Sequence, residues 1–151
     1  MTADARRRVA DALVLVGGAA LVASAFVHWV SSGDGSGLRG HALVDALIAV
    51  GRHFPGLSAA RLTILWYLVP ALGAASWIAA GLRGPGSRVA RGIAAASVVA
   101  TLAAFVAFGW LVGFAHLGLG AWTAVVGAGA LVAGSWIVAT RDAEQPATGR
   151  G

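Results

Sequence analysis

Long apolar stretches separated by short polar segments form the main pattern of this chain. A helix that crosses a membrane needs roughly 20 mostly apolar residues, because about 30 Å of hydrocarbon is covered at about 1.5 Å per residue. Residues 12–30 and residues 62–82 each meet this requirement without a charged side chain. The pattern therefore predicts two membrane-spanning helices in the first half of the chain.

The third apolar stretch, residues 92–140, is far longer than a single crossing and also carries no charged side chain. It must fold back on itself, and we expect the turn at Ala115–Gly120, where one His and two Gly interrupt the apolar run. This turn divides the stretch into spans near 92–114 and 119–140. The predicted fold is thus an all-α membrane protein with four transmembrane helices, in which residues 1–151 form a single membrane domain.

The connection between the first two spans, residues 31–61, shows a different pattern. It begins with a flexible Ser/Gly-rich connector and continues into residues 41–54, where apolar residues recur every three or four positions. Such spacing places the apolar residues on one face of a helix and the polar residues on the other. We expect a short amphipathic helix on the outer membrane surface, with an apolar face of Leu43, Leu47, Val50 and Phe54 and a polar face of His41, Asp45 and Arg52.

Composition agrees with a membrane protein and excludes several chemistries. The chain is 58% hydrophobic and 11% charged, whereas soluble domains are about 45–50% apolar and about 25% charged. The absence of Cys excludes thiol catalysis, disulfides, iron–sulfur clusters and thiolate zinc sites. Ion-coupled transporters usually carry a charged residue inside the membrane, and the absence of one from all four spans argues against coupled transport.

The basic residues, all Arg, predict the orientation in the membrane, because short cytoplasmic loops collect them. Most lie on one side of the four-span layout, which places both termini, the loop 83–91 and the tail 141–151 in the cytoplasm. The topology-setting residues are Arg6, Arg7, Arg8, Arg83, Arg88, Arg91 and Arg141, against Arg39, Arg52 and Arg61 on the outer side. We therefore expect a multi-pass protein of the cell (plasma) membrane. The basic residues form no solvated stripe, so nucleic acid is not an expected partner.

The aromatic residues fit this orientation. They fall near the ends of the spans, as expected for residues that anchor a helix in the membrane interface. The predicted outer belt contains Trp29, Trp66, Tyr67, Trp110, Phe114 and Trp122, and the predicted inner belt contains Trp77 and Trp136.

One alternative concerns the first span. Its basic flank, its apolar core and the small residues Ala23, Ser24 and Ala25 also resemble a cleavable signal peptide. The apolar run continues to Val30, which is long for such a segment, so we favour a retained span. Mass analysis of the mature N-terminus would distinguish the two.

The two halves of the chain resemble each other, which indicates a tandem duplication of one helical hairpin. The first and third spans both follow an Arg-Val-Ala sequence, at residues 8–10 and 88–90. The second and fourth spans both end in Ser-Trp-Ile, at residues 76–78 and 135–137. The alternative is convergence, since Ala-rich spans with interfacial Trp and Arg resemble one another by chance.

Small residues in the last two spans are candidates for helix packing, since close backbone approach drives helix association in lipid. They recur at helical spacing, which serves either a four-helix bundle or a seam with another subunit. The candidate packing residues are Gly109, Gly113, Gly120, Ala124, Ala128, Gly129 and Ala133.

All four histidines fall on the outer side in this topology. Imidazole binds metals and haem iron, so His28 and His116 are candidate cofactor ligands. No pair has the spacing that aligns two ligands on one helical face, and we predict no metal site and no bound cofactor. His41 and Asp45 lie one helical turn apart, but no nucleophile accompanies them, so no catalytic residue is predicted.

The residues also resemble a known group, the uncharacterised small four-span integral membrane proteins of actinobacteria. The resemblance covers roughly residues 9–140 and rests on the stretches HWVSSGDGSGL, ALVDALIAVG and WYLVPALGAASW. These match a first span that ends in Trp, a Ser/Gly loop with a short helix, and a second span of W-x-x-x-P character. The resemblance implies the four-span topology and implies no activity.

We therefore expect a non-enzymatic integral membrane protein that acts as an accessory or assembly subunit through helix–helix packing. Its partners would be the lipid bilayer and other membrane subunits or a second copy of itself. Two alternatives remain: an oligomeric passive channel or small-solute transporter, and a haem- or metal-binding membrane subunit that uses the outer histidines.

Overall fold

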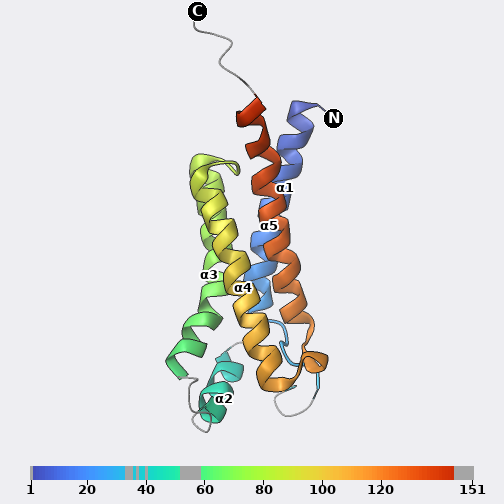
Figure 1. Cartoon of the computed structure of the whole chain (residues 1–151). Coiled ribbons are helices and arrows are strands. Elements are labelled where there is room, and N and C mark those ends of the chain that lie inside the picture. Colours follow the sequence, from blue (N-terminus) through green and yellow to red (C-terminus); the bar gives the residue numbers. More distant parts are fainter. Residues whose placement is uncertain (1, 33–35, 37, 40, 52–58, 145–151) are drawn as a thin grey trace, which may run out of the picture.

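The apolar stretches of the chain form the long helices of a computed structural model, which describes residues 2–32, 36, 38–39, 41–51 and 59–144 (Figure 1). The protein is all-α, and four long helices pack side by side as a bundle. The helices are α1 (Ala3–Ser24), α2 (His41–Gly51), α3 (Ala59–Arg83), α4 (Arg88–Val112), the short 3₁₀ helix η1 (Phe114–His116) and α5 (Leu119–Glu144).

The four long helices alternate in direction, and each packs against two others. Helix α1 contacts α3 and α5, and α4 contacts the same two helices from the opposite side. The start of α1, the end of α5 and the turn between α3 and α4 lie together at one end, which we call the terminal end (Figure 1). Helix α2, η1 and the last turn of α1 lie at the other, which we call the loop end.

Three of these helices are long and apolar enough to cross a membrane, with candidate spans Thr63–Arg83, Arg88–Trp110 and Leu119–Val138. The protein therefore has the character of a multi-pass membrane protein. Helix α1 differs, because its first turns are charged and it ends at Ser24 and not near Val30 as the apolar pattern suggested. Its apolar helical part, from Ala12 to Ser24, covers only roughly 20 Å.

Part of the chain after α1 is buried in the bundle although it is no longer helical. Trp29 and Val30 are both 1% exposed, and the indole N–H of Trp29 donates to the carbonyl oxygen of Ser24 at 2.8 Å. That bond satisfies one of the carbonyls that a helix end leaves without a partner. Non-helical backbone is tolerated at membrane depth only where protein surrounds it, and Trp29 and Val30 meet that condition.

An aromatic cluster fills the bundle where α1 has ended. The ring centroids of Trp29 and Trp66 lie 5.0 Å apart, those of Trp29 and Phe108 5.0 Å, and those of Trp66 and Phe108 5.6 Å. The expectation that Trp29 and Trp66 belong to an interfacial belt is therefore wrong, since both rings are buried. Trp110 and Trp122, at the same end, are 83% and 53% exposed.

Helix α2 packs against α3 at the loop end. Val44 is buried and Ile48 packs against the core, so one side of α2 is covered by the bundle, while Asp45 is exposed. The helix was expected to continue to residue 54, but residues 52–58 lie outside the described residues. The side chains of the expected apolar face, Leu43, Leu47, Val50 and Phe54, also lie outside them.

Candidate functional site

Helices α1 and α5 approach each other closely through glycine. A Cβ atom added at Gly17 would lie 2.7 Å from the carbonyl oxygen of Gly127, and one added at Gly127 would lie 2.9 Å from the carbonyl oxygen of Gly17. Distances this short leave no room for any side chain. The two backbones therefore touch directly, which is how helices without a hydrophobic driving force gain packing energy in lipid.

The same contact continues along α5 at Gly134, seven residues after Gly127. A Cβ atom at Gly134 would lie 2.8 Å from the carbonyl oxygen of Ala10 and 3.0 Å from Cβ of Leu13. A seven-residue repeat keeps one line of a helix against its neighbour. We call this line and the facing positions of α1 the glycine seam.

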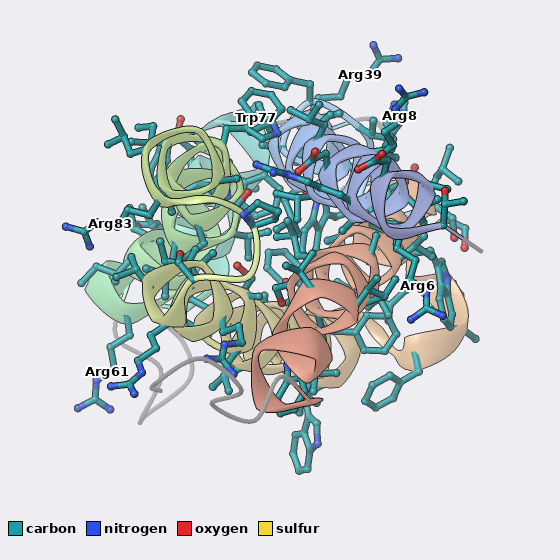
Figure 2. All side chains as sticks on the ribbon, turned by 90° about the horizontal axis from the view of Figure 1, so that it is seen from above. Arg6, Arg8, Arg39, Arg61, Trp77 and Arg83 are labelled. Atoms are coloured by element: carbon teal, nitrogen blue, oxygen red, sulfur yellow. The ribbon has the colours of Figure 1, made fainter. Side chains whose placement is uncertain are left out.

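Helix α1 also packs closely against α3, on its adjacent side. A Cβ atom at Gly18 would lie 2.8 Å from the hydroxyl of Ser76, and one at Gly73 would lie 2.9 Å from the carbonyl oxygen of Gly18. The indole N–H of Trp77 donates to the carbonyl oxygen of Leu15 at 3.0 Å, across the two helices (Figure 2). The adjacent pair Gly17 and Gly18 thus allows α1 to approach both neighbours at once.

The candidate packing residues take four different positions. Ala124 and Ala128 are buried in the bundle, at 0% and 3% exposure. Gly129 and Ala133 are exposed on the outer face of α5, and no atom lies within 4 Å of a Cβ added at Gly129. Gly109 and Gly113 lie at the end of α4, and Gly120 lies beside the Trp29 ring.

Gly109 and Gly113 form the end of α4. The N–H of Gly113 donates to the carbonyl oxygen of Gly109 at 2.9 Å, and Gly113 has a φ of 86°, which favours glycine. A Cβ atom at Gly109 would meet the ring of Phe114. Their GxxxG spacing therefore serves a tight turn in this structure and places neither residue between two of the long helices.

Residues 28–31, which follow α1, and residues 116–120, which lead into α5, form a backbone junction at the loop end. Val30 and Leu117 form an antiparallel bridge, the N–H of Gly118 donates to the carbonyl of Trp29 at 2.7 Å, and the N–H of Gly120 donates to the carbonyl of His28 at 2.8 Å. The last of these satisfies a free N–H of the first turn of α5. The end of α1 and the start of α5 are thereby held together by main-chain bonds.

Glycine is required at this junction. A Cβ atom at Gly118 would lie 2.5 Å from the carbonyl oxygen of His28, and one at Gly120 would lie 2.6 Å from Cδ1 of Trp29. Gly120, chosen from the sequence as a packing residue, is thus in contact with the Trp29 ring and not with a helix backbone.

Both candidate cofactor ligands, His28 and His116, belong to this junction. Arg39 Nε donates to Nε2 of His28 at 3.0 Å, and Nδ1 of His116 lies 2.6 Å from the hydroxyl of Ser32. Ser31 also donates to the carbonyl oxygen of His116, through its N–H at 2.8 Å and its hydroxyl at 3.0 Å. The ring of His116 therefore joins the two sides of the junction, whereas the ring of His28 accepts a hydrogen bond from Arg39.

A metal centre is not formed by the side chains that can be placed. Across residues 2–32, 36, 38–39, 41–51 and 59–144, no three His, Asp or Glu side chains gather closely enough to hold an ion. His41, Arg52 and Arg141 lie outside the described side chains, so only Asp45 of the predicted outer polar face can be placed. The charged Arg side chains labelled in Figure 2, including Arg8 and Arg83, extend outward from the bundle.

Most hydroxyl groups inside the bundle donate hydrogen bonds to carbonyl oxygens of their own helix. The hydroxyls of Ser24, Ser76, Ser97 and Ser135 donate to carbonyl oxygens three or four residues earlier, at 2.6–3.0 Å. Thr101 is 1% exposed, and its hydroxyl has no hydrogen-bond partner among the described residues.

No protein-family profile matches this chain, and no curated protein and no solved structure matches it significantly.

Proposed function

We propose that this protein is a non-enzymatic subunit of the plasma membrane that assembles with another membrane-protein chain through the outer face of α5. The observation that carries the proposal is that Gly129 and Ala133, four residues apart, are exposed on α5. Small residues at this spacing let a second helix approach closely in lipid. No atom lies within 4 Å of a Cβ built at Gly129.

The two faces of α5 differ in a way that supports this proposal. One face carries the glycine seam and is covered by α1. The opposite face carries Trp122, Val126, Gly129, Ala133 and Trp136. Trp122 is 53% exposed, Val126 is 69% exposed and Trp136 is 56% exposed. The small residues thus form a shallow depression between two exposed Trp side chains. Trp is enriched at the hot spots of protein interfaces.

The orientation with both termini in the cytoplasm is part of the proposal. At the terminal end the described residues include Arg6, Arg7, Arg8, Arg83 and Arg88, all exposed. The positive-inside rule assigns such an end to the cytoplasmic leaflet. The opposite end carries Arg39 and Arg61.

A tandem duplication is supported by matching environments in the two halves. Val9 and Val89 are 41% and 40% exposed, while the residues that follow them, Ala10 and Ala90, are buried. Ser76 and Ser135 are both buried and both donate to a carbonyl oxygen three residues earlier. The pairing of α1 with α4 and of α3 with α5 also fits a two-fold axis along the bundle.

The test is purification of the full chain from native membranes in a mild detergent, with the mass of the complex and its components measured. We expect the wild type to co-purify with a second chain in stoichiometric amount. Gly129→Leu should lose that chain, because the Leu side chain fills the shallow depression. Gly81→Leu is the matched control, since Gly81 is exposed on α3 and no atom lies within 4 Å of its added Cβ.

Other outcomes decide against the proposal. A closed assembly of this chain alone that conducts solutes in liposomes would replace it with the passive channel. Soret absorption in the purified protein, lost in His28→Ala or His116→Ala, would replace it with the haem-binding subunit. Equal loss of the partner in Gly129→Leu and Gly81→Leu would remove the assignment of the α5 face.

A further inference from the structure

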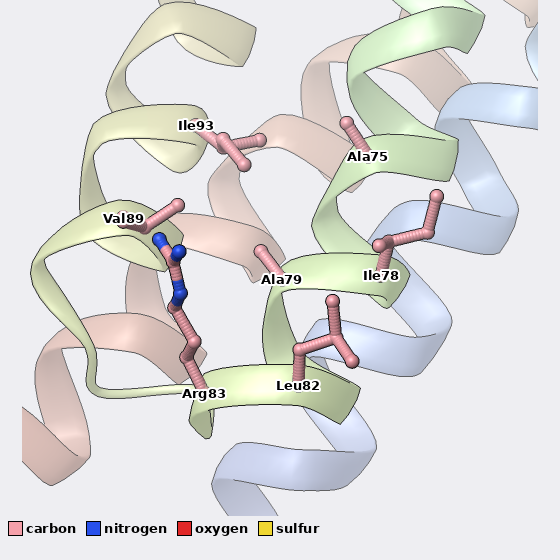
Figure 3. Close-up of a pocket in the computed structure, with 7 residues that line it drawn as sticks. All are labelled: Ala75, Ile78, Ala79, Leu82, Arg83, Val89 and Ile93. Atoms are coloured by element: carbon pink, nitrogen blue, oxygen red, sulfur yellow. The ribbon is translucent and has the colours of Figure 1, made fainter.

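Helices α3 and α4 leave an apolar groove between them near the terminal end, beside the turn that joins them (Figure 3). The groove has a volume of about 230 Å³. Its lining consists of aliphatic side chains and one charged group, with Ala75, Ile78, Ala79, Leu82 and Arg83 from α3 and Val89 and Ile93 from α4. Both helices are candidate membrane spans over this region, so the open side of the groove faces hydrocarbon.

The repeat explains why the groove is present on this side of the bundle. Aligning Ser76 with Ser135 places Ala75 opposite Gly134, and aligning Val89 with Val9 places Ile93 opposite Leu13. In the pair α1 and α5, Gly134 touches Ala10 and Leu13 at the glycine seam. In the pair α3 and α4, Ala75 carries the methyl group that Gly134 lacks and Ile93 is branched at Cβ, so the same close approach is blocked.

Arg83 gives the groove a polar end. It lies in the last turn of α3, where its positive charge suits the helix dipole, and its side chain extends alongside Val89 (Figure 3). The guanidinium group is exposed. The segment from Leu82 to Ile93 also carries Arg88 and Arg91 and no acidic residue, so the field at this end of the groove is positive.

We propose that this groove binds a phospholipid with an anionic head group, with one acyl chain along the aliphatic lining and the phosphate at Arg83. An acyl chain matches an apolar channel that opens sideways into the bilayer. A guanidinium group at the depth where the span ends matches a phosphate in geometry and charge. A partner helix is a poorer occupant, because its rigid cylinder of about 10 Å diameter does not enter a groove of about 230 Å³.

The test uses the purified full chain in a mild detergent with two probes, dioleoylphosphatidylglycerol and dioleoylphosphatidylcholine. Retained lipid is counted by native mass spectrometry. We expect preferential retention of one phosphatidylglycerol by the wild type, and a loss of that preference of about fivefold in Arg83→Gln. Ala75→Leu should lower retention of both lipids, because its side chain fills the groove.

Arg8→Gln is the matched control, because Arg8 is an exposed Arg at the same end that does not line the groove. It should retain phosphatidylglycerol as the wild type does. Equal retention of the two lipids by the wild type would overturn the proposal, as would equal losses in Arg8→Gln and Arg83→Gln, which would indicate a diffuse positive surface. Co-purification of a protein that only Ala75→Leu displaces would also overturn it. Because Arg83 is exposed, Arg83→Gln should fold even if Ala75→Leu does not, and circular dichroism checks both.

Discussion

Gly17 and Gly127 touch each other through their backbones, with an added Cβ on either residue falling within 2.9 Å of the other residue's carbonyl oxygen. This reciprocal contact belongs to the glycine seam between α1 and α5. The contact holds α1 against α5. The apolar helical part of α1 is too short to span a membrane without the rest of the bundle. The contact also predicts that a side chain introduced at either glycine destabilises the bundle.

Gly17→Leu should destabilise the protein by about 1–3 kcal/mol or more, because the side chain must push α1 away from α5. The measurement is the free energy of unfolding in a denaturing-detergent titration. Gly81→Leu is the control, since its added side chain points into open space, and it should change the free energy little. Equal effects of the two substitutions would contradict the seam.

Trp29→Ala should destabilise the protein by about 3–5 kcal/mol, the usual cost of removing a large aromatic side chain from a core. Trp29 is 1% exposed and contacts the rings of Trp66 and Phe108. The control is Trp110→Ala, because Trp110 is 83% exposed and its loss should cost far less. The same titration measures both, and a larger cost for Trp110→Ala would place Trp29 outside the core.

Thr101→Val should stabilise the protein by about 1 kcal/mol, because it removes a buried hydroxyl that has no described hydrogen-bond partner. Val has nearly the same shape as Thr, so packing is kept. Thr123→Val is the comparison, since the hydroxyl of Thr123 donates to the carbonyl oxygen of Leu119 at 2.8 Å and its removal should give no gain. Melting temperatures of the purified proteins decide the point, and a lower value for Thr101→Val would indicate that the hydroxyl has a partner.

Gly118→Ala should disrupt the junction at the loop end, because the new methyl group would press on the carbonyl oxygen of His28. We expect faster hydrogen exchange at the amide of Gly120, whose N–H donates to that carbonyl. Gly129→Ala makes the same chemical change on an exposed helix face and should leave this amide protected. Unchanged exchange in Gly118→Ala would mean that the junction tolerates a side chain.

The orientation can be tested by single-cysteine labelling, since the chain has no Cys of its own. In intact cells a membrane-impermeant maleimide should label Ser32→Cys, at the loop end, and should not label Gly86→Cys, in the turn between α3 and α4. Permeabilised cells should show labelling of both. The reverse pattern would place the terminal end outside.

Several features of the fold follow directly from the sequence. Charge-free apolar runs predict α3, α4 and α5, because backbone groups in hydrocarbon must bond within their own helix. The break between α4 and α5 was also predictable, since His116, Gly118 and Gly120 interrupt the apolar run. The amphipathic spacing after residue 41 predicted α2, and its described part is indeed helical.

The end of α1 was not predictable from apolarity. Residues 25–30 are as apolar as the helix before them, and only tertiary contacts make a non-helical path favourable there. Trp29 leaves the helix to fill the space between Trp66 and Phe108. The N–H groups of Gly118 and Gly120 donate to the carbonyl oxygens of Trp29 and His28. Hydropathy measures burial and does not distinguish burial in lipid from burial in protein, so Trp29 was assigned to the interface.

Apolar segments, clusters of charge and repeated residues can be recognised along the chain, because they depend on local composition and spacing. The role of each glycine depends on the folded bundle: Gly17 and Gly127 join two helices, Gly109 and Gly113 form a turn, and Gly129 faces outward. A glycine has no side chain whose polarity indicates a direction. Its role depends on which backbone approaches it, and that is set by how the helices rotate and cross in the assembled bundle.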